Sequence, residues 1–500
     1  MVARDPRRSF WESLGETQTA ISLILLYGAV MFLLRFALSP NLNGGEAAQM
    51  LFGQSLQWNY LPDRPPLMTW LSWAALRLGQ DSRLALFLLR EILLVLGLIA
   101  FFFSARRVLG ERRRAALAVM FLAATFGLGW LAQAGRPDTV LLACMCCFYL
   151  WAGTRALLRG RYFDYAVLGL VTGVGVLASY VFLVLPFAMS VALALTPEWR
   201  ARLRPVPLMA AAAIAALIVG LYFAFAPAAA VSSHDGRHAP LAAILGSFAI
   251  AFVLFALPAV LIFVALYRRA CMPLPPQDRA ESWLRFLKIT MLTALIVALL
   301  AMLLVRRGDA EASWIYPVLL PLPIYLFLRT QLAQPDADDG NDRIFVRFVL
   351  ACIVAGIGVR VWMYQTRAHD CRHCAEYWPL ARYADTFRQA GFVTGTIVAP
   401  RPALAGNLRL VFPEARVVTP DAPARRFGAP VRGECLVVWD GNDANISPRL
   451  RDYVETTYGA KLQERAMQGD VEAALLKGKG RRARMNFLIL ADGACDRPRA

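Results

Sequence analysis

The sequence predicts a membrane protein that is all-α in its membrane part, with about eleven transmembrane helices, followed by a C-terminal soluble α/β domain. Hydrophobic residues make up 58% of the 500 residues and charged residues 18%, a balance too apolar for a soluble enzyme. The apolar residues gather in segments of about 17 to 25 residues, the length that a helix needs to cross a bilayer. From residue 367 onward the composition is that of a soluble domain. We therefore expect a transmembrane domain at 1–366 and a soluble domain at 367–500.

The membrane crossings are predicted from the apolar segments. They lie at 20–38, 85–104, 115–131, 139–158, 164–179, 180–196, 206–228, 241–266, 288–305, 313–328 and 345–363. The pair at 164–196 has two interpretations, because a helical hairpin and one long helix share the same pattern there. The first segment has full length and lacks a small-residue cleavage site, so we expect it to remain as a membrane helix.

The net charge of +18 is distributed unevenly over the loops. Arginine is concentrated in alternate loops, for example at 106–114, 155–161 and 200–204. Positive charge marks the cytoplasmic side of a membrane protein, so the N-terminus is predicted to be cytoplasmic. An odd number of crossings then places the C-terminal domain outside. With the charge explained by topology, no nucleic-acid partner is expected.

Two outer segments interrupt the helical pattern. The first outer loop, 39–84, contains amphipathic stretches at 46–58 and 67–78 that are suited to helices lying at the membrane surface. The second segment, 132–138, leads into the start of the fourth crossing. We expect functional residues in these two segments.

The soluble domain shows an alternation of helix and strand patterns. Helices are expected at 375–390 and 448–458, and strands at 396–399, 416–418, 435–439 and 486–490. Its cysteines allow several interpretations. Four cysteines in an oxidising compartment can form two disulfides or remain free thiols, or the first two can begin a zinc site with His373. The cysteines are Cys371, Cys374, Cys435 and Cys495.

Charged residues at the outer face of the membrane part are the candidates for chemistry. An arginine can hold a phosphate leaving group while a carboxylate takes a proton from an attacking hydroxyl. Each candidate also has a structural interpretation: solvated side chain, loop salt bridge, helix cap or headgroup anchor. The candidates are Glu46, Asp63, Arg64, Arg136, Asp138, Arg306 and Arg307.

Three motifs carry a resemblance to a known family. They read NGGEAAQMLFGQSLQWNYLPDRPPLMTWL, GRPDTVLL and EASWIYPVLLPLPIYLFL. Together they resemble motifs of the polytopic membrane glycosyltransferases of the GT-C fold. The chain looks most like the bacterial branch with lipid A aminoarabinose transferases and relatives of protein O-mannosyltransferases. The resemblance covers roughly residues 20–330.

The resemblance implies a reaction and a location. A sugar would pass from a polyprenyl phosphate carrier to lipid A, lipopolysaccharide or another envelope acceptor. The enzyme would lie in the bacterial inner membrane, with its C-terminal domain in the periplasm. Its partners would be the lipid-linked donor, a lipid or glycan acceptor and membrane lipids; a divalent metal is possible, and no other cofactor is implied.

The resemblance also suggests residue roles. The family's first outer loop carries an Asp-Glu pair whose aspartate is catalytic, but this chain has Gly45 there and retains Glu46. Glu46 and Asp138 are therefore the expected catalytic residues. The expected substrate-binding residues are Asp63, Arg64, Arg136, Arg306 and Arg307. Two replaced positions keep an alternative open. Gly45 stands in place of the family's aspartate, and Ser179 stands where the family often has a lysine. The alternative is a non-catalytic protein that binds a lipid-linked sugar or acts as a scaffold.

Overall fold

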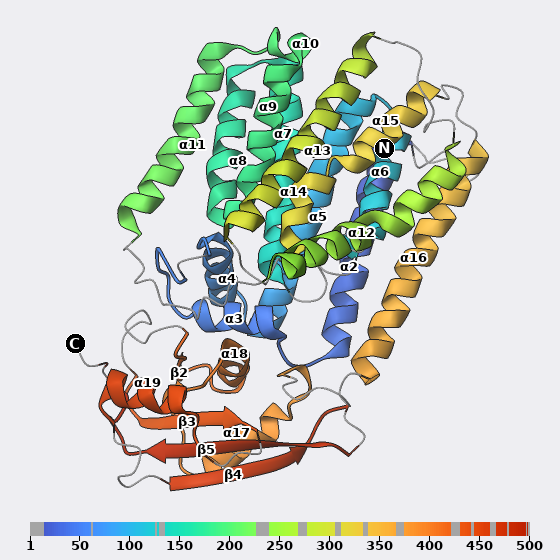
Figure 1. Cartoon of the computed structure of the whole chain (residues 1–500). Coiled ribbons are helices and arrows are strands. Elements are labelled where there is room, and N and C mark those ends of the chain that lie inside the picture. Colours follow the sequence, from blue (N-terminus) through green and yellow to red (C-terminus); the bar gives the residue numbers. More distant parts are fainter. Residues whose placement is uncertain are drawn as a thin grey trace, which may run out of the picture. The chain divides into compact units, whose positions relative to one another are not determined.

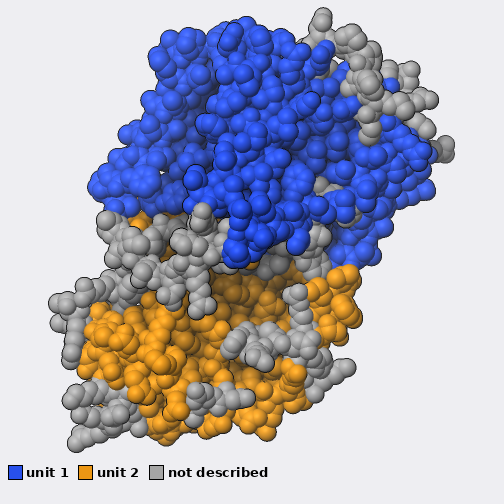
Figure 2. Space-filling model, in the orientation of Figure 1, with its two compact units in different colours: residues 1–31, 90–134, 138–357 blue, residues 32–89, 135–137, 358–500 orange. Residues whose placement is uncertain are grey.

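The computed structural model describes residues 15–61, 64–125, 128–129, 136–226, 240–268, 278–305, 312–333, 339–366, 375–421, 431–441, 445–460, 467–477, 480–496 and 498. The chain forms two compact units, coloured separately in Figure 2. Unit 1 consists of residues 1–31, 90–134 and 138–357, and unit 2 of residues 32–89, 135–137 and 358–500. Unit 2 therefore combines the first outer loop with the C-terminal domain.

Long helices make up the membrane part (Figure 1). Six helices of the described residues are long and apolar enough to cross a membrane, and α8 and α9 are shorter apolar helices. The six are α2 (Thr17–Leu38), α5 (Ser82–Leu109), α7 (Pro137–Arg159), α11 (Pro205–Phe225), α13 (Asp278–Val305) and α16 (Asp339–Thr366). The others are α6 (Arg112–Ala124), α8 (Tyr162–Ala178), η3 (Tyr180–Leu183), α9 (Val184–Leu195), α10 (Pro197–Arg200), α12 (Leu241–Leu266), η5 (Ala312–Ile315), α14 (Tyr316–Leu319) and α15 (Leu322–Ala333).

Where the structure describes the predicted crossings, helices occupy them, so the helical architecture is confirmed. The total of eleven crossings stays a prediction. The segment 313–328 is divided among η5, α14 and α15. Its prolines, Pro317, Pro321 and Pro323, remove backbone donors and prevent one continuous helix.

The chain reverses direction between α8 and α9. Tyr149 and Phe182 have their ring centroids 5.7 Å apart, and a Cβ on Gly153 would lie 3.1 Å from the methyl carbon of Met189. These contacts follow the same order along α7 and along the segment formed by η3 and α9, so α7 and α9 are parallel. Because α8 connects them, it runs back between them, with extended backbone at Ser179 (φ −166°, ψ 138°) ending it. Of the two interpretations of 164–196, the hairpin is correct.

The C-terminal domain is built on a five-stranded sheet with the order β2-β1-β3-β5-β4. Strands β2, β1 and β3 are parallel, and β5 is antiparallel to both β3 and β4. The strands are β1 (Gly395–Val398), β2 (Arg416–Val418), β3 (Glu434–Asp440), β4 (Met467–Ala474) and β5 (Arg482–Leu490). The helices are η7 (Ala375–Tyr377), α17 (Leu380–Gln389), α18 (Pro402–Val411) and α19 (Pro448–Tyr458).

The predicted strands of this domain are confirmed, whereas β4 and α18 were missed. Strand β4 lies at the sheet edge with most of its side chains exposed, so it lacks an apolar signal. A disulfide joins Cys435 to Cys495, so the disulfide interpretation is correct for these two cysteines, whose pairing the sequence did not predict. Cys371, His373 and Cys374 lie outside the described residues, so both the disulfide and the zinc interpretation stay predictions for them.

The first outer loop forms two helices, as predicted. They are α3 (Gly44–Phe52) and α4 (Leu67–Leu78). Leu51, Phe52 and Tyr60 share one hydrophobic core with the strands and helices of the C-terminal sheet. The loop is thus part of that domain's core, which the sequence did not predict.

A glycine permits the close packing of α18 on α3. A Cβ on Gly406 would lie only 2.0 Å from the carbonyl oxygen of Ala47, while a Cβ on Gly44 would meet nothing within 4 Å. We expect Gly406→Ala to destabilise the protein by about 1–3 kcal/mol, because two helix backbones must separate. Thermal unfolding of the purified protein measures this, with Gly44→Ala as the matched control. Equal melting temperatures for both variants would contradict this packing.

Candidate functional site

The start of α3 is fixed by a reciprocal pair of hydrogen bonds. The Asn43 side chain accepts a bond from the Glu46 backbone N–H at 3.1 Å. The Glu46 carboxylate in turn accepts a bond from the Asn43 backbone N–H at 3.2 Å. This capping box allows a helix to begin at two glycines, which are poor helix formers.

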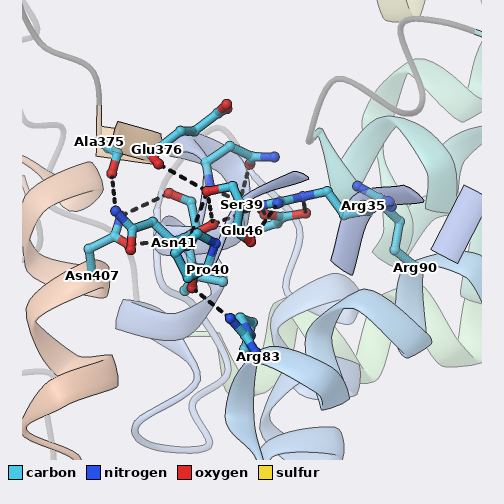
Figure 3. A network of polar contacts seen from close by, with 12 residues as sticks. Arg35, Ser39, Pro40, Asn41, Glu46, Arg83, Arg90, Ala375, Glu376 and Asn407 are labelled. Atoms are coloured by element: carbon cyan, nitrogen blue, oxygen red, sulfur yellow. Dashed lines mark hydrogen bonds and ion pairs between the residues drawn. The ribbon is translucent and has the colours of Figure 1, made fainter. Parts of the chain in front are cut away.

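The same carboxylate forms a buried ion pair with Arg35 of α2 (Figure 3). Arg35 Nη2 lies 2.5 Å from Glu46 Oε2, and Arg35 Nε lies 3.2 Å from Oε1. The two side chains are 4% and 2% exposed. The guanidinium also donates to the Asn41 carbonyl oxygen at 2.9 Å and lies 4.2 Å from the Phe87 ring centroid. A two-point contact of this kind fixes both position and orientation.

Hydrogen bonds continue from this pair into the C-terminal domain. The Asn41 side-chain amide donates to the carbonyl oxygens of Ala375 at 3.0 Å and Trp378 at 2.7 Å. The Ser39 hydroxyl donates to the Glu376 carbonyl oxygen at 2.9 Å. Figure 3 shows these groups converging on residues 39–46. The end of α2 is therefore tied directly to η7.

Asn407 of α18 makes a second link between the two segments. Its side-chain oxygen accepts a bond from the Leu42 backbone N–H, and its side-chain nitrogen donates to the Leu42 carbonyl oxygen, both at 2.9 Å. Asn407 is fully buried. A buried side-chain amide that bonds to both the N–H and the carbonyl oxygen of one residue fixes the position of that backbone segment.

These contacts bear on the role expected for Glu46. Both of its carboxylate oxygens already accept hydrogen bonds in the protein interior. To take a proton from a substrate hydroxyl, the carboxylate would have to exchange one of these bonds. The geometry therefore suits a residue that positions the first outer loop, while the catalytic role stays a prediction.

The other expected site residues lie in varied surroundings. Asp138 is half-buried in the first turn of α7, and Arg136 just before this helix is exposed. Arg64 is exposed, and its backbone N–H donates to the Leu61 carbonyl oxygen at 3.3 Å. Asp138 belongs to unit 1, while Glu46 and Arg64 belong to unit 2, so their meeting in one pocket stays a prediction. Asp63, Arg306 and Arg307 lie outside the described residues.

Arg35, Asn41, Asn43 and Asn407 were not singled out from the sequence. Arg35 carried a signal, since it is the one arginine or lysine in the apolar segment 20–38, and charges there are costly enough to need a partner. Asn43 carried another, because Asn three residues before Glu matches a capping box. Among the described residues, no three His, Cys, Asp or Glu side chains gather to hold a metal ion, so the divalent metal stays a prediction.

Comparison with known proteins identifies related sequences. Residues 63–223 match the family model described as dolichyl-phosphate-mannose-protein mannosyltransferase. Lipopolysaccharide core galacturonosyltransferase RgtA of Rhizobium johnstonii is 29% identical over 89% of this chain and 92% of its own length. The corresponding enzyme RgtB of that organism is 26% identical over 92% of this chain and 94% of its own length.

Comparison of structures identifies a related fold. The crystal structure of ArnT from Cupriavidus metallidurans bound to undecaprenyl phosphate superimposes with a TM-score of 0.60 at 14% identity. The match covers 93% of this chain and 97% of that one. The apo structure of the same protein gives a TM-score of 0.62. The match therefore extends through both compact units, well beyond the family-model segment.

Proposed function

We propose that this chain, which is a membrane glycosyltransferase with the GT-C fold, transfers a sugar from a polyprenyl phosphate carrier to the lipopolysaccharide core. The reaction would take place at the outer face of the bacterial inner membrane. The observation that carries this proposal is the likeness of fold over 93% of the chain to ArnT, which was crystallised with undecaprenyl phosphate.

The proposed sugar is galacturonic acid. Support comes from the names of two relatives, each aligned over most of this chain. Lipid A is the second candidate acceptor, because the sequence motifs resemble those of lipid A aminoarabinose transferases. The disulfide between Cys435 and Cys495 supports a periplasmic C-terminal domain, since disulfides form and persist in oxidising compartments.

The proposed reaction is a displacement at the anomeric carbon of the sugar. An acceptor hydroxyl oxygen bonds to this carbon, the bond from this carbon to the phosphate oxygen breaks, and the polyprenyl phosphate leaves with the bonding electrons. The hydroxyl proton passes to a carboxylate acting as general base. Arginines stabilise the charge that develops on the phosphate.

We assign the base role to Asp138 and a positioning role to Glu46. Asp138 is half-buried in the first turn of its helix, whereas Glu46 is 2% exposed and ion-paired. Arg64 and Arg136, both exposed, are the proposed phosphate ligands among the described residues. Asp63, Arg306 and Arg307 remain proposed substrate-binding residues on the resemblance alone.

The proposal is tested with purified protein in lipid nanodiscs. Radiolabelled polyprenyl phosphate galacturonic acid is supplied with a lipopolysaccharide core acceptor or with lipid A. We expect label to move to the core acceptor. Label that moves only to lipid A would refute the proposed acceptor, and label that stays on the carrier with both acceptors would refute the proposed activity.

Gly45 favours a second candidate function, a protein that binds a lipid-linked sugar without transferring it. The family's catalytic aspartate is absent at this position, which lies in the first turn of α3. If the present site is complete, Gly45→Asp should leave the transfer rate close to that of the wild type in the radiolabel assay. If an inactive wild type gained transfer through Gly45→Asp, the chain would be a binding protein with a decayed site.

A further inference from the structure

A second group of positive charges lies in unit 2, apart from the Arg35–Glu46 pair. It consists of Arg77, in the last turn of α4, and Arg409, in the last turn of α18. Among the described residues, neither arginine forms an ion pair. None of the roles described above uses either residue.

Arg409 is a mostly buried guanidinium with spare donors. Its Nη1 donates to the Met50 carbonyl oxygen at 2.6 Å. Its Nε is buried and has no hydrogen-bond partner among the described residues. A guanidinium carries five N–H donors, so one carbonyl oxygen leaves most of them available.

Helices α4 and α18, which carry the two arginines, both pack against α3. Leu76 and Leu410, the arginines' immediate neighbours in sequence, both pack against one small core. That core consists of Leu42, Ala47, Met50, Leu86 and Phe87. Arg77 is exposed, and its guanidinium carbon lies 5.9 Å from the Trp73 ring centroid. The C-terminal end of α3 is the common neighbour of the two arginines: a Cβ on Gly53 would lie 2.8 Å from the Leu76 side chain, and Arg409 donates to the Met50 carbonyl oxygen.

The pKa of Arg409 is affected by its burial and by the charge of Arg77. Burial and, to a smaller degree, the positive charge of Arg77 together lower the pKa of Arg409 to about 10, while Glu414 acts in the opposite direction. Glu414 forms no salt bridge with Arg409 within the described part of the chain. Two like charges, one of them largely desolvated, are costly unless an anion joins them.

A purely structural role accounts for only part of these observations. The bond to Met50 places positive charge near the C-terminal end of α3, where it interacts favourably with the helix dipole. This explains one donor of Arg409. It explains neither the unpartnered Nε nor the second arginine beside it.

We propose that Arg77 and Arg409 together bind an anionic oxygen group, a phosphate or a carboxylate, on the acceptor glycan. Guanidinium groups match the planar or tetrahedral oxygen pairs of such anions. The site is built from the first outer loop and the C-terminal domain, the segments proposed to lie in the periplasm. This inference rests on the proposed function in taking the acceptor to be an anionic envelope glycan.

The test compares Arg77→Gln, Arg409→Gln and the charge-retaining Arg409→Lys with the wild type in nanodiscs. Arg451→Gln is the matched control, because Arg451 is an exposed arginine of the same unit on α19. Each glutamine variant is expected to raise the KM for the core acceptor about tenfold or more with little change in kcat. Arg451→Gln should stay close to the wild type, and Arg409→Lys should raise the KM less than Arg409→Gln does, because lysine keeps the charge but loses the two-point geometry. An unchanged KM in Arg77→Gln, an exposed position that tolerates substitution, would overturn the proposal.

Two further arms identify the source of the anion. With a core oligosaccharide whose phosphates are removed and carboxylates reduced, the difference between wild type and variants should vanish. The difference should persist in phosphatidylcholine nanodiscs with or without phosphatidylglycerol. A defect that appears only with phosphatidylglycerol would overturn the assignment to the acceptor in favour of a lipid headgroup.

A binding measurement separates this inference from the proposed function. Calorimetry of the full chain with the intact core oligosaccharide, without donor, should show about tenfold weaker binding by both glutamine variants. Wild-type protein that binds the oligosaccharide but transfers no sugar would refute the proposed function and support the anion site. Equal binding by wild type and variants would refute the anion site alone.

Discussion

Asp138→Asn is expected to lower kcat for sugar transfer by about a hundred- to ten-thousand-fold, the usual contribution of a general base. Asparagine has nearly the same shape as aspartate but cannot accept the hydroxyl proton. It also remains an acceptable residue at a helix start, so insertion and folding should be retained. The radiolabel assay measures the rate, and the melting temperature of the same preparation verifies folding.

A matched control for Asp138→Asn is Glu198→Gln. Glu198 is also an acidic residue in the first turn of a helix, α10, where it forms an exposed ion pair with Arg285. This variant should transfer sugar at the wild-type rate, since exposed ion pairs contribute little. Normal transfer by Asp138→Asn would show that another group accepts the proton.

Glu46→Gln and Arg35→Gln are each expected to destabilise the protein by about 3–5 kcal/mol. Each variant leaves the opposite charge buried without its partner. The double variant should therefore be little less stable than either single variant, and the three together form a double-mutant cycle. Denaturant unfolding of the purified protein measures the free energies.

The same variants distinguish positioning from proton transfer. If Glu46 acts through Arg35, both single variants should lose transfer to a similar degree, and the residual activity should keep the wild-type pH profile. A Glu46→Gln variant with wild-type stability and no transfer, beside an active Arg35→Gln variant, would make Glu46 the base. The outcome thus decides between the role expected from the sequence and the role favoured by the geometry.

The membrane helices were predictable because their signal is local. A helix must satisfy its own backbone in lipid, so an apolar stretch of sufficient length is informative without knowledge of its neighbours. The same holds for the strands β1, β3 and β5, whose buried apolar runs stand out from polar surroundings. The turn at Ser179 was ambiguous, since hydropathy reports burial in lipid and carries no information on chain direction.

The buried polar network was not predictable, because it depends on contacts between distant residues. Asn407 and Leu42 are separated by 365 positions, and no local pattern pairs an asparagine with a backbone so far away. Helix α18 was missed for a related reason. Its Gly406 would weaken an isolated helix, yet the close approach of α3 requires a glycine there.

The candidate site was only partly accessible from the sequence. Its position in the first outer loop marked Glu46 as a catalytic candidate, but the sequence could not reveal that the carboxylate is buried and ion-paired with Arg35. Arg35 lies in the last turn of α2. From the sequence, this segment is predicted only as an apolar membrane helix, so its arginine was not singled out. The role of Asp138 remains a prediction, because its residue type and helix position fit both a cap and a base.

Mass spectrometry of the lipopolysaccharide core tests the central claim most directly. The comparison uses a bacterium that lacks this chain, the same cells with the wild-type chain restored, and the same cells with Asp138→Asn. The account predicts that only the wild-type chain adds a hexuronic acid residue to the core. A core of identical mass in all three strains would contradict the assignment of this chain as a core glycosyltransferase.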